Sequence, residues 1–326
     1  MTKIIAELCQ NHNGDLKILD EMVSAAAESG ADYVKIQSML SKELTHRPKF
    51  DDGQVDKDGN IKIIKRPFQV EFDRLKKLDL DDDAHFLFLE MCKKYKVKPM
   101  TTIFSRSRLK LLEKLNLEII KVSSFDCSSH KMIEELCTSN FKEIIVSTGC
   151  AFDEEIEKTA KILEKHKKDF TLLHCVSIYP TPINEAHLDR INFLKKFSKN
   201  VGLSEHSNPL NDGLKISIAS LLYEPKYIER HFTILDQNKT KDGPVSLNPK
   251  QLNELSIIAK KSKEEIKAYI DNNIKEFDLL KGNATRKLSH KEILNRDYYA
   301  DYFTSLSFIS SCIERISVQI RHMQRT

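Results

Sequence analysis

The 326-residue sequence lacks any apolar stretch close to the roughly 20 residues that a membrane span needs. Its first residues lead directly into an apolar segment, Lys3-Ile4-Ile5-Ala6, and do not have the layout of a signal peptide. One sign of charge does not dominate either, because 52 Lys and Arg residues face 48 Asp and Glu residues. A net charge of +4 gives no indication of nucleic-acid binding. We therefore expect neither membrane nor nucleic-acid partners.

Cysteine pairs with the spacing of metal knuckles or redox motifs are also missing. The seven cysteines are scattered, and none of them forms a C-x-x-C pair. This pattern indicates neither a zinc knuckle nor a disulfide framework. Several of the cysteines lie in apolar runs, where a free thiol acts as a small hydrophobic side chain. We expect a protein of the reducing cytoplasm.

Glycine and proline disappear towards the end of the chain, since none follows Gly282 and Pro249 respectively. From Tyr302 to Met323 the apolar residues recur at alternating spacings of three and four, which is typical of a packed or coiled helix. The sequence thus predicts a helical C-terminal extension over residues 271–326. It would pack either on the rest of its own chain or on a second subunit.

Eight short apolar runs are each followed by polar side chains that could bind or react. In order, these side chains are Glu7; Lys35 and Gln37; Thr102; Lys121 and Ser124; Ser147; His174 and Ser177; Ser204 and His206; and His231. Helical patterns such as Leu16 to Ser29 separate the runs. Buried parallel strands form such runs, and barrel enzymes build their active site at the carboxyl ends of the strands. We predict an α/β fold, a (β/α)8 TIM barrel over residues 1–270.

The segment from Ser41 to Leu80 interrupts this alternation of strands and helices. It is highly charged and contains two Asp-Gly pairs. Val55 and Ile61 to Ile64 flank the second pair, which predicts a small β-hairpin. A connection of this length often forms a lid or a binding loop.

Two histidines at neighbouring predicted strand ends, His206 and His231, are candidate ligands for one divalent metal ion. Two ligands from the protein would leave coordination positions open for a substrate, as a catalytic metal requires. The spacing fits two unrelated polar histidines equally well.

Two lysines, Lys35 and Lys121, also end apolar runs, where a buried cation needs an anion. With the hydroxyls of Ser124, Ser147 and Ser204 they could hold a phosphate and a carboxylate. Each lysine could instead be a solvated strand end, and Lys121 could be a Schiff-base nucleophile.

Five further polar residues could bind or activate a hydroxylated substrate. They are Glu7, Gln37, Asp126, Tyr179 and Asp242. Asp126 follows a predicted strand closely enough to act as an acid or a base, although a carboxylate there could equally cap a loop.

Several of these segments, in this order, resemble the sialic acid synthase family, the N-acetylneuraminate and other nonulosonic acid synthases. The resemblance covers residues 3 to about 250. The matching segments are Ile5-Ala6-Glu7 with Asn11-His12-Asn13-Gly14, Gly30 to Gln37, Lys121 to Asp126, Ser147-Thr148-Gly149, Leu172 to Cys175 with Tyr179 to Pro182, Gly202 to His206, and Ile228 to Thr233.

The resemblance implies a transferase that condenses phosphoenolpyruvate with the aldehyde of an N-acyl hexosamine and releases phosphate. The sugar would be N-acetylmannosamine or a 6-deoxy diacetamido sugar, and the product would serve surface-carbohydrate biosynthesis. The resemblance also implies a homodimer and a divalent metal, Mn²⁺ or Mg²⁺, at His206 and His231.

The resemblance assigns roles to other residues by position. Lys35, Thr102, Lys121, Ser124, Ser147, Ser177 and Ser204 match phosphoenolpyruvate-binding positions, with Ser177 standing where many relatives have asparagine. Glu7, Gln37, Tyr179 and Asp242 match sugar-binding positions. Asp126 matches the Glu or Asp that handles the proton or water at the reacting carbon.

The chain departs from the family pattern after the barrel. Many relatives continue into a small antifreeze-like domain, rich in Gly and Pro, which lends an arginine to the sugar site of a partner subunit. That composition does not follow Gly282, and no counterpart of the arginine can be placed in the sequence. Two alternatives to the synthase therefore stay open, namely a Schiff-base aldolase that uses Lys121, and a catalytically degenerate barrel that serves as a binding or assembly subunit.

Overall fold

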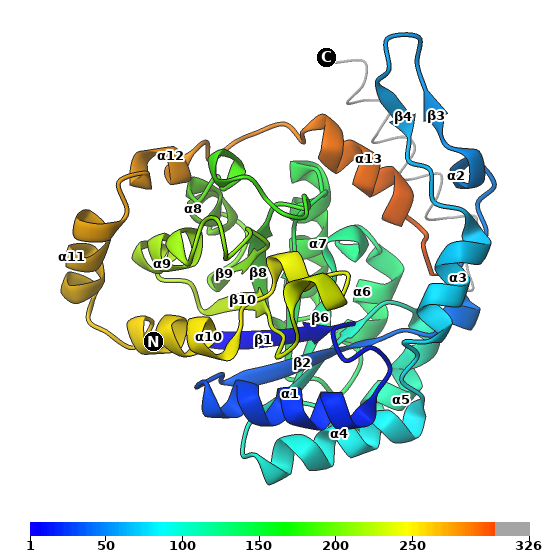
Figure 1. Cartoon of the computed structure of the whole chain (residues 1–326), viewed down its shortest axis with the longest axis horizontal. Helices are drawn as coiled ribbons and strands as arrows, with labels where there is room; N and C mark the ends of the chain where they lie inside the picture. Colours follow the sequence, from blue (N-terminus) through cyan, green and yellow to red (C-terminus); the bar gives the residue numbers. More distant parts are fainter. Residues whose placement is uncertain (304–326) are drawn as a thin grey trace.

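The eight apolar runs form a closed parallel β-barrel in the computed structural model, which describes residues 1–303 (Figure 1). The barrel strands are β1 (Lys3–Cys9), β2 (Tyr33–Ser38), β5 (Lys98–Ile103), β6 (Ile119–Val122), β7 (Glu143–Ser147), β8 (Asp169–Cys175), β9 (Val201–Glu205) and β10 (Tyr227–His231). The ring runs β1-β10-β9-β8-β7-β6-β5-β2 and is closed by parallel pairing of β1 with β2. The predicted barrel is confirmed.

Helices surround the barrel and connect its strands. They are α1 (Leu16–Glu28), α4 (Asp82–Lys94), α5 (Leu109–Lys114), α6 (His130–Cys137), α7 (Asp153–Lys165), α8 (Asp189–Leu194), α9 (Lys215–Ser220) and α10 (Pro249–Ile258). After α10 the chain starts a separate helix, α11 (Lys263–Asn273), at a capping box formed by Ser262 and Glu265. Within residues 1–303, we find no helix with the length and apolar character of a membrane span.

Alternation along the strands divides each strand into an inner and an outer face. A separate apolar cluster consists of one residue from each of seven strands, namely Ile5, Tyr33, Met100, Ile119, Ile145, Leu173 and Tyr227. Two residues further along the same strands come Glu7, Lys35, Thr102, Lys121, Ser147, Cys175 and Glu229, all of which line one cavity. The barrel interior therefore has an apolar floor with a polar layer directly above it.

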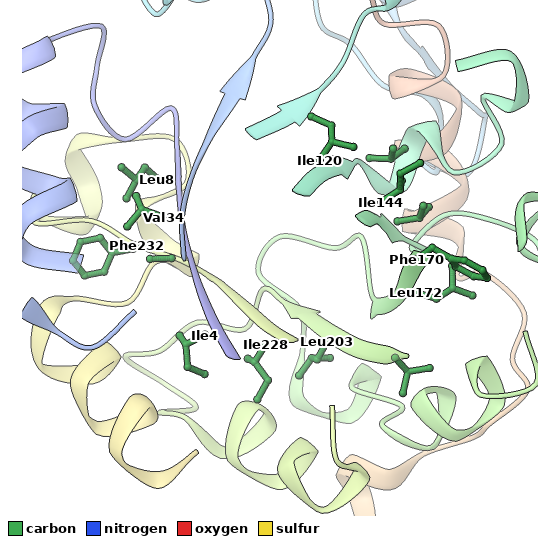
Figure 2. Close-up of a cluster of buried hydrophobic side chains, with 14 of the residues drawn as sticks. Ile4, Leu8, Val34, Ile120, Ile144, Phe170, Leu172, Leu203, Ile228 and Phe232 are labelled. Atoms are coloured by element: carbon green, nitrogen blue, oxygen red, sulfur yellow. The ribbon is translucent and has the colours of Figure 1, made fainter. Parts of the chain in front are cut away.

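The residues between these inward positions belong to the main hydrophobic core. Ile4, Val34, Ile144 and Ile228 are completely buried or nearly so, and they lie between the strands and the surrounding helices (Figure 2). This outer core holds the helices against the barrel, so the inner face is free to carry polar side chains.

The segment between β2 and α4 and the C-terminal end of the described chain pack together (Figure 1). The segment contains α2 (Lys49–Asp52), the predicted hairpin of β3 (Gln54–Val55) and β4 (Ile61–Ile63), and α3 (Phe68–Lys76). The C-terminal part contains α12 (Phe277–Lys281) and α13 (His290–Tyr299). Phe50 and Leu75 from the first segment form an apolar cluster with Tyr298, Tyr302 and Phe303 from the second.

We call this cluster and the two segments that build it the lid. The lid is further tied by a hydrogen bond from the Thr45 amide to the Tyr302 carbonyl, 2.9 Å long, and by an ion pair between Lys49 and Asp297 at 2.7 Å. The remainder of the predicted 302–323 helix lies outside the described residues.

Candidate active site

A cavity of about 410 Å³ opens at the carboxyl ends of the barrel strands, beneath the lid. Thirteen of the fourteen predicted site residues line it: Glu7, Lys35, Gln37, Thr102, Lys121, Ser124, Asp126, Ser147, Tyr179, Ser204, His206, His231 and Asp242. They come from strands or strand ends all around the ring. The fold thus brings together residues that are up to 235 positions apart in the sequence.

Ser177 is the exception among the predicted residues. It is completely buried and is not among the residues that line the cavity. It lies two residues beyond the end of β8, and its hydroxyl turns towards Gly149, where a Cβ atom would come within 2.4 Å of it. Because Gly149 has no side chain, the Ser177 hydroxyl fits beside it and does not line the cavity.

Lys35 and Lys121 are both buried in the polar layer, and Glu229 lies between them. The Lys121 Nζ atom donates to Glu229 Oε1 at 3.2 Å, and Lys35 Nζ lies 3.8 Å from Glu229 Oε2. Burial would raise the pKa of the Glu229 carboxyl, but the charges of Lys121 and Lys35 outweigh burial and lower it to about 2. Glu229 is therefore an ionised carboxylate that contacts both buried lysines.

Lys35 has two further partners on the cavity wall. Its ammonium group donates to Thr102 Oγ1 at 2.7 Å and forms an ion pair with the Glu7 carboxylate. The other Glu7 oxygen, Oε1, accepts the Cys9 amide at 2.6 Å. Glu7, which was predicted to bind the sugar, is thus paired with Lys35, which was predicted to bind phosphoenolpyruvate.

Two serine hydroxyls of the polar layer, those of Ser204 and Ser147, differ in their hydrogen bonds. Ser204 donates to Glu229 Oε1 at 3.0 Å. Ser147 is 2% exposed, and its hydroxyl has no hydrogen-bond partner within residues 1–303. A buried hydroxyl without a partner costs stability, so one that faces a cavity beside two lysines indicates a ligand.

His206 and His231 lie side by side at the rim, with ring centroids 5.1 Å apart. Burial lowers the pKa of both imidazoles, that of His206 further than that of His231, so both rings are neutral at physiological pH. Neutral imidazoles offer a lone pair to a metal. The His231 Nδ1 atom is buried without a hydrogen-bond partner in the described chain, so these residues fit a divalent metal ion.

Cys9, the last residue of β1, lies next to the histidines. Its thiol donates to Asp242 Oδ2 at 2.8 Å and accepts from Gln37 Nε2 at 3.1 Å. Burial raises the pKa of this thiol, and the nearby Asp242 charge raises it further. The backbone of Cys9 has a φ of 50°, in the left-handed region that residues other than glycine seldom adopt.

Asp126 and Tyr179 both line the cavity, beyond the ends of β6 and β8. Asp126 ends a single 3-10 turn after β6 and accepts hydrogen bonds from the Ser123 hydroxyl at 2.7 Å and the Ser129 hydroxyl at 3.2 Å. Tyr179 follows β8, and its ring centroid lies 4.3 Å from that of His206. Tyr179 is 42% exposed, so its ring borders the opening of the cavity.

Comparison with known proteins agrees with this geometry. The NeuB family model matches residues 22–270. The chain belongs to the NeuB family.

Relatives of this chain are named as synthases of related acids. N,N'-diacetyllegionaminic acid synthase of Campylobacter jejuni is 34% identical over 267 residues, which are 78% of this chain and 74% of the relative. Pseudaminic acid synthase of Helicobacter pylori is 30% identical and covers 76% of this chain and 70% of its own length. The citrate complex of N-acetylneuraminic acid synthetase from Leptospira borgpetersenii superposes with a TM-score of 0.70 at 26% identity, over 92% of each chain.

Several residues of this NeuB family site could not be inferred from the sequence. From the lid, the cavity is lined by Arg66, Glu71, Arg74, Asn295, Tyr299, Tyr302 and Phe303. The Arg66 Nη1 atom donates to the Tyr299 hydroxyl at 2.7 Å, and the Tyr299 ring stacks on Phe125 with centroids 4.4 Å apart. Arg74 forms a two-pronged ion pair with Glu71 and donates to Gln10 Oε1. The contact between Arg66 and Tyr299 joins residues 233 positions apart, for which the sequence has no local signal.

Proposed function

We propose that this chain condenses phosphoenolpyruvate with the aldehyde of an N-acyl hexosamine and yields a nonulosonic acid and inorganic phosphate. The observation that carries the proposal is the buried pair of Lys35 and Lys121 beside the unpartnered Ser147 hydroxyl. Two cations and a free donor at the bottom of a cavity suit a small, highly charged anion. Membership of a family whose named relatives are nonulosonic acid synthases supports the same reaction.

In this proposal the polar layer binds phosphoenolpyruvate. Lys35 and Lys121 hold its phosphate and carboxylate, and the hydroxyls of Thr102, Ser124, Ser147 and Ser204 complete the cradle. Burial lowers the pKa of Lys35 to about 7, and the charge of Glu229 opposes this effect. The cradle fixes the enol carbon C3 so that it faces the mouth of the cavity, where the second substrate enters.

The mouth binds the sugar. Gln37, Tyr179 and Asp242 line the cavity and offer hydrogen-bonding groups for the sugar hydroxyls. Tyr299 and Arg66 of the lid close this end together with Phe125, which follows β6, so that a stacked aromatic pair lies beside a guanidinium. Such a wall suits the apolar face and the acyl carbonyl of an N-acyl sugar.

The bond changes follow from this placement. C3 of phosphoenolpyruvate attacks the aldehyde carbon, whose oxygen takes up a proton and becomes a hydroxyl, and water adds to the cationic C2. The tetrahedral adduct then expels phosphate by cleavage of the C–O bond. Asp126 lies at the mouth, where its carboxylate accepts the proton of the attacking water.

A divalent metal ion, Mn²⁺ or Mg²⁺, fits beside His206 and His231, which offer neutral imidazoles and one buried nitrogen without a partner. When bound there, the ion would supply Lewis acidity to the sugar aldehyde. We also expect the active protein to be a homodimer.

The decisive experiment incubates the protein with Mn²⁺, phosphoenolpyruvate and a panel that includes N-acetylmannosamine and a 6-deoxy diacetamido hexose. We expect sugar-dependent phosphate release, a product whose mass equals that of the sugar plus pyruvate, and loss of activity on chelation. Turnover that resists chelation, or full activity after the double change His206→Ala and His231→Ala, would contradict the metal assignment.

The same preparation separates the two alternatives. A Schiff-base aldolase would give a pyruvate adduct on Lys121 after borohydride reduction, whereas we expect no adduct, because Lys121 is paired with Glu229. A degenerate barrel would bind phosphoenolpyruvate and metal without releasing phosphate with any sugar of the panel.

A further inference from the structure

Three potential metal-binding side chains meet at the rim of the barrel. The Cys9 sulfur, an imidazole nitrogen of His231 and a carboxylate oxygen of Asp242 all lie within 4.8 Å of one another. Metal–ligand bonds of about 2.0–2.3 Å place neighbouring ligands some 3–4 Å apart. The three side chains therefore need only small shifts to share one ion.

The fold brings these ligands together from two neighbouring strands and a loop. Cys9 ends β1, His231 ends β10, and the two strands pair in parallel with Glu7 opposite His231. Asp242 begins the short 3-10 turn Gly243–Val245 that follows β10. Two of the ligands are therefore held by the barrel itself, which is the rigid support that a metal site requires.

A second, independent observation points to a ligand at the same place. His231 is 6% exposed, and its Nδ1 atom has no hydrogen-bond partner anywhere in residues 1–303. Leaving such an atom unpaired costs roughly 1–3 kcal/mol unless something binds it.

One neighbouring group would stabilise Cys9 as a metal-bound thiolate. Gln37 Nε2 donates to Cys9 Sγ at 3.1 Å, and an amide donor of this kind stabilises negative charge on a metal-bound sulfur. The thiol proton points at Asp242 Oδ2, the other candidate ligand. Replacing that proton by a cation keeps both groups in contact with a positive charge.

We propose that Cys9 and Asp242 complete the metal site, so that a thiolate and a carboxylate bind the ion together with the histidines. The inference rests on the proposed function for the presence of a metal, and it moves Asp242 from the sugar side to the metal. Binding is a simple exchange in which the divalent ion displaces the Cys9 proton to solvent, with no change of oxidation state.

The chemical consequence concerns metal choice. A thiolate ligand favours softer ions such as Zn²⁺, Co²⁺ and Fe²⁺, whereas Mg²⁺ prefers oxygen ligands and keeps much of its water. We therefore expect the site to bind Co²⁺ or Zn²⁺ at least ~10-fold more tightly than Mn²⁺, and Mg²⁺ more weakly still.

The test titrates Co²⁺ into the metal-free full chain under anaerobic conditions and records the absorption spectrum. We expect one Co²⁺ per chain and a thiolate-to-cobalt charge-transfer band in the near ultraviolet. In Cys9→Ser the band should disappear and Co²⁺ affinity should fall ~10-fold or more, in line with the loss of a metal ligand. Asp242→Asn should keep the band but bind Co²⁺ more weakly.

The matched control is Cys175→Ser, because Cys175 also lines the cavity and lies 3.8 Å from His206 Nδ1. This variant should keep the band. A wild-type protein that binds Co²⁺ without the band, or a band that survives Cys9→Ser and vanishes in Cys175→Ser, overturns the inference, as does a wild-type protein that binds no Co²⁺. If Cys9→Ser does not fold, the wild-type spectrum and Asp242→Asn still decide the question.

The spectrum also separates this inference from the proposed function. A charge-transfer band without phosphate release leaves the thiolate site in place and contradicts the synthase. Phosphate release by a protein without the band supports the synthase and removes Cys9 from the metal.

Discussion

Lys121 and Glu229 form an ion pair across the inside of the barrel, with Nζ and Oε1 3.2 Å apart. Their strands, β6 and β10, are four places apart in the closed ring of eight and therefore face each other. The same carboxylate lies 3.8 Å from Lys35 Nζ. One glutamate thus balances two buried ammonium groups that would otherwise repel each other.

Replacing this carboxylate tests its role directly. We expect Glu229→Gln to lower the free energy of unfolding by about 3–5 kcal/mol, because buried cations lose their counter-ion. Inorganic phosphate should raise the melting temperature of the variant more than that of the wild type, since the anion replaces the lost charge. Urea unfolding and thermal melting with and without phosphate measure both effects.

The control for this change is Glu224→Gln, which removes an exposed ion pair with Lys263 and should leave stability unchanged. A Glu229→Gln variant as stable as the wild type would show that the lysines are not held by this carboxylate.

Glu229 also shows where prediction from sequence stops. It lies inside an apolar run, and a residue there faces either the helices or the barrel interior. The eight runs and their polar ends were enough to predict the barrel and ten residues of the cavity, because the carboxyl ends of the strands meet at one rim. Which side chains pair within the rim depends on the stagger between strands, which no local pattern encodes.

The lid could be predicted only in part, for a different reason. The hairpin within it follows from its Asp-Gly turn, and the structure confirms it. Its contact with α13 joins residues such as Arg66 and Tyr299, 233 positions apart. Their packing depends on the tertiary fold alone. The prediction for Ser177 failed for a similar reason, because the direction of its side chain depends on the space beside Gly149, a residue distant in the sequence.

Because the Ser147 hydroxyl has no partner in the described protein, we expect its removal to weaken substrate binding without changing the free energy of unfolding. Ser147→Ala removes no protein hydrogen bond and should leave the free energy of unfolding within about 0.5 kcal/mol of the wild type. The hydroxyl should bind the phosphoenolpyruvate anion, so the KM for phosphoenolpyruvate should rise by ~10-fold or more. Urea unfolding and steady-state kinetics give the two quantities.

Ser217→Ala provides the matched control with the opposite outcome. Its hydroxyl donates to Glu205 Oε2 at 2.6 Å and accepts from Arg230 Nη1 at 3.0 Å, in a buried network outside the cavity. This variant should lose about 1–3 kcal/mol of stability with an unchanged KM. If Ser147→Ala behaves in the same way, the Ser147 hydroxyl does not bind the anion.

The contacts of Glu71 in the lid should make the free energy of unfolding depend on pH in the acid range. Burial would raise the pKa of its carboxyl, but hydrogen bonds from Arg74, the charge of Lys241 and a hydrogen bond from Tyr302 lower it to about 2, from an ordinary value of 4.5. A pKa that is lower in the folded state gives stability that is complete above about pH 5 and lost as the pH falls towards 2. This contribution is on the order of 3 kcal/mol.

Glu71→Gln should therefore be less stable than the wild type at pH 7, and the difference between the two should shrink steadily between pH 5 and the lowest pH at which both fold. Urea unfolding at a series of pH values follows this difference. A gap that stays constant with pH would mean that the Glu71 charge contributes nothing to the lid.

Because Tyr299 of the lid lines the cavity, we expect the lid to contribute to sugar binding. Tyr299→Leu removes both the stacking on Phe125 and the acceptor for Arg66, so the KM for the sugar should rise by ~10-fold, while the KM for phosphoenolpyruvate, bound deeper in the barrel, should not change. Tyr299→Phe keeps the stacking and should cause a smaller rise.

Tyr298→Phe is the control, because Tyr298 is buried in the lid and is not among the residues that line the cavity. A lid that only covers the barrel would change both KM values together, and it would respond to Tyr298→Phe as much as to Tyr299→Phe. A lid that binds substrate changes one KM, and only when the side chain that faces the cavity is altered.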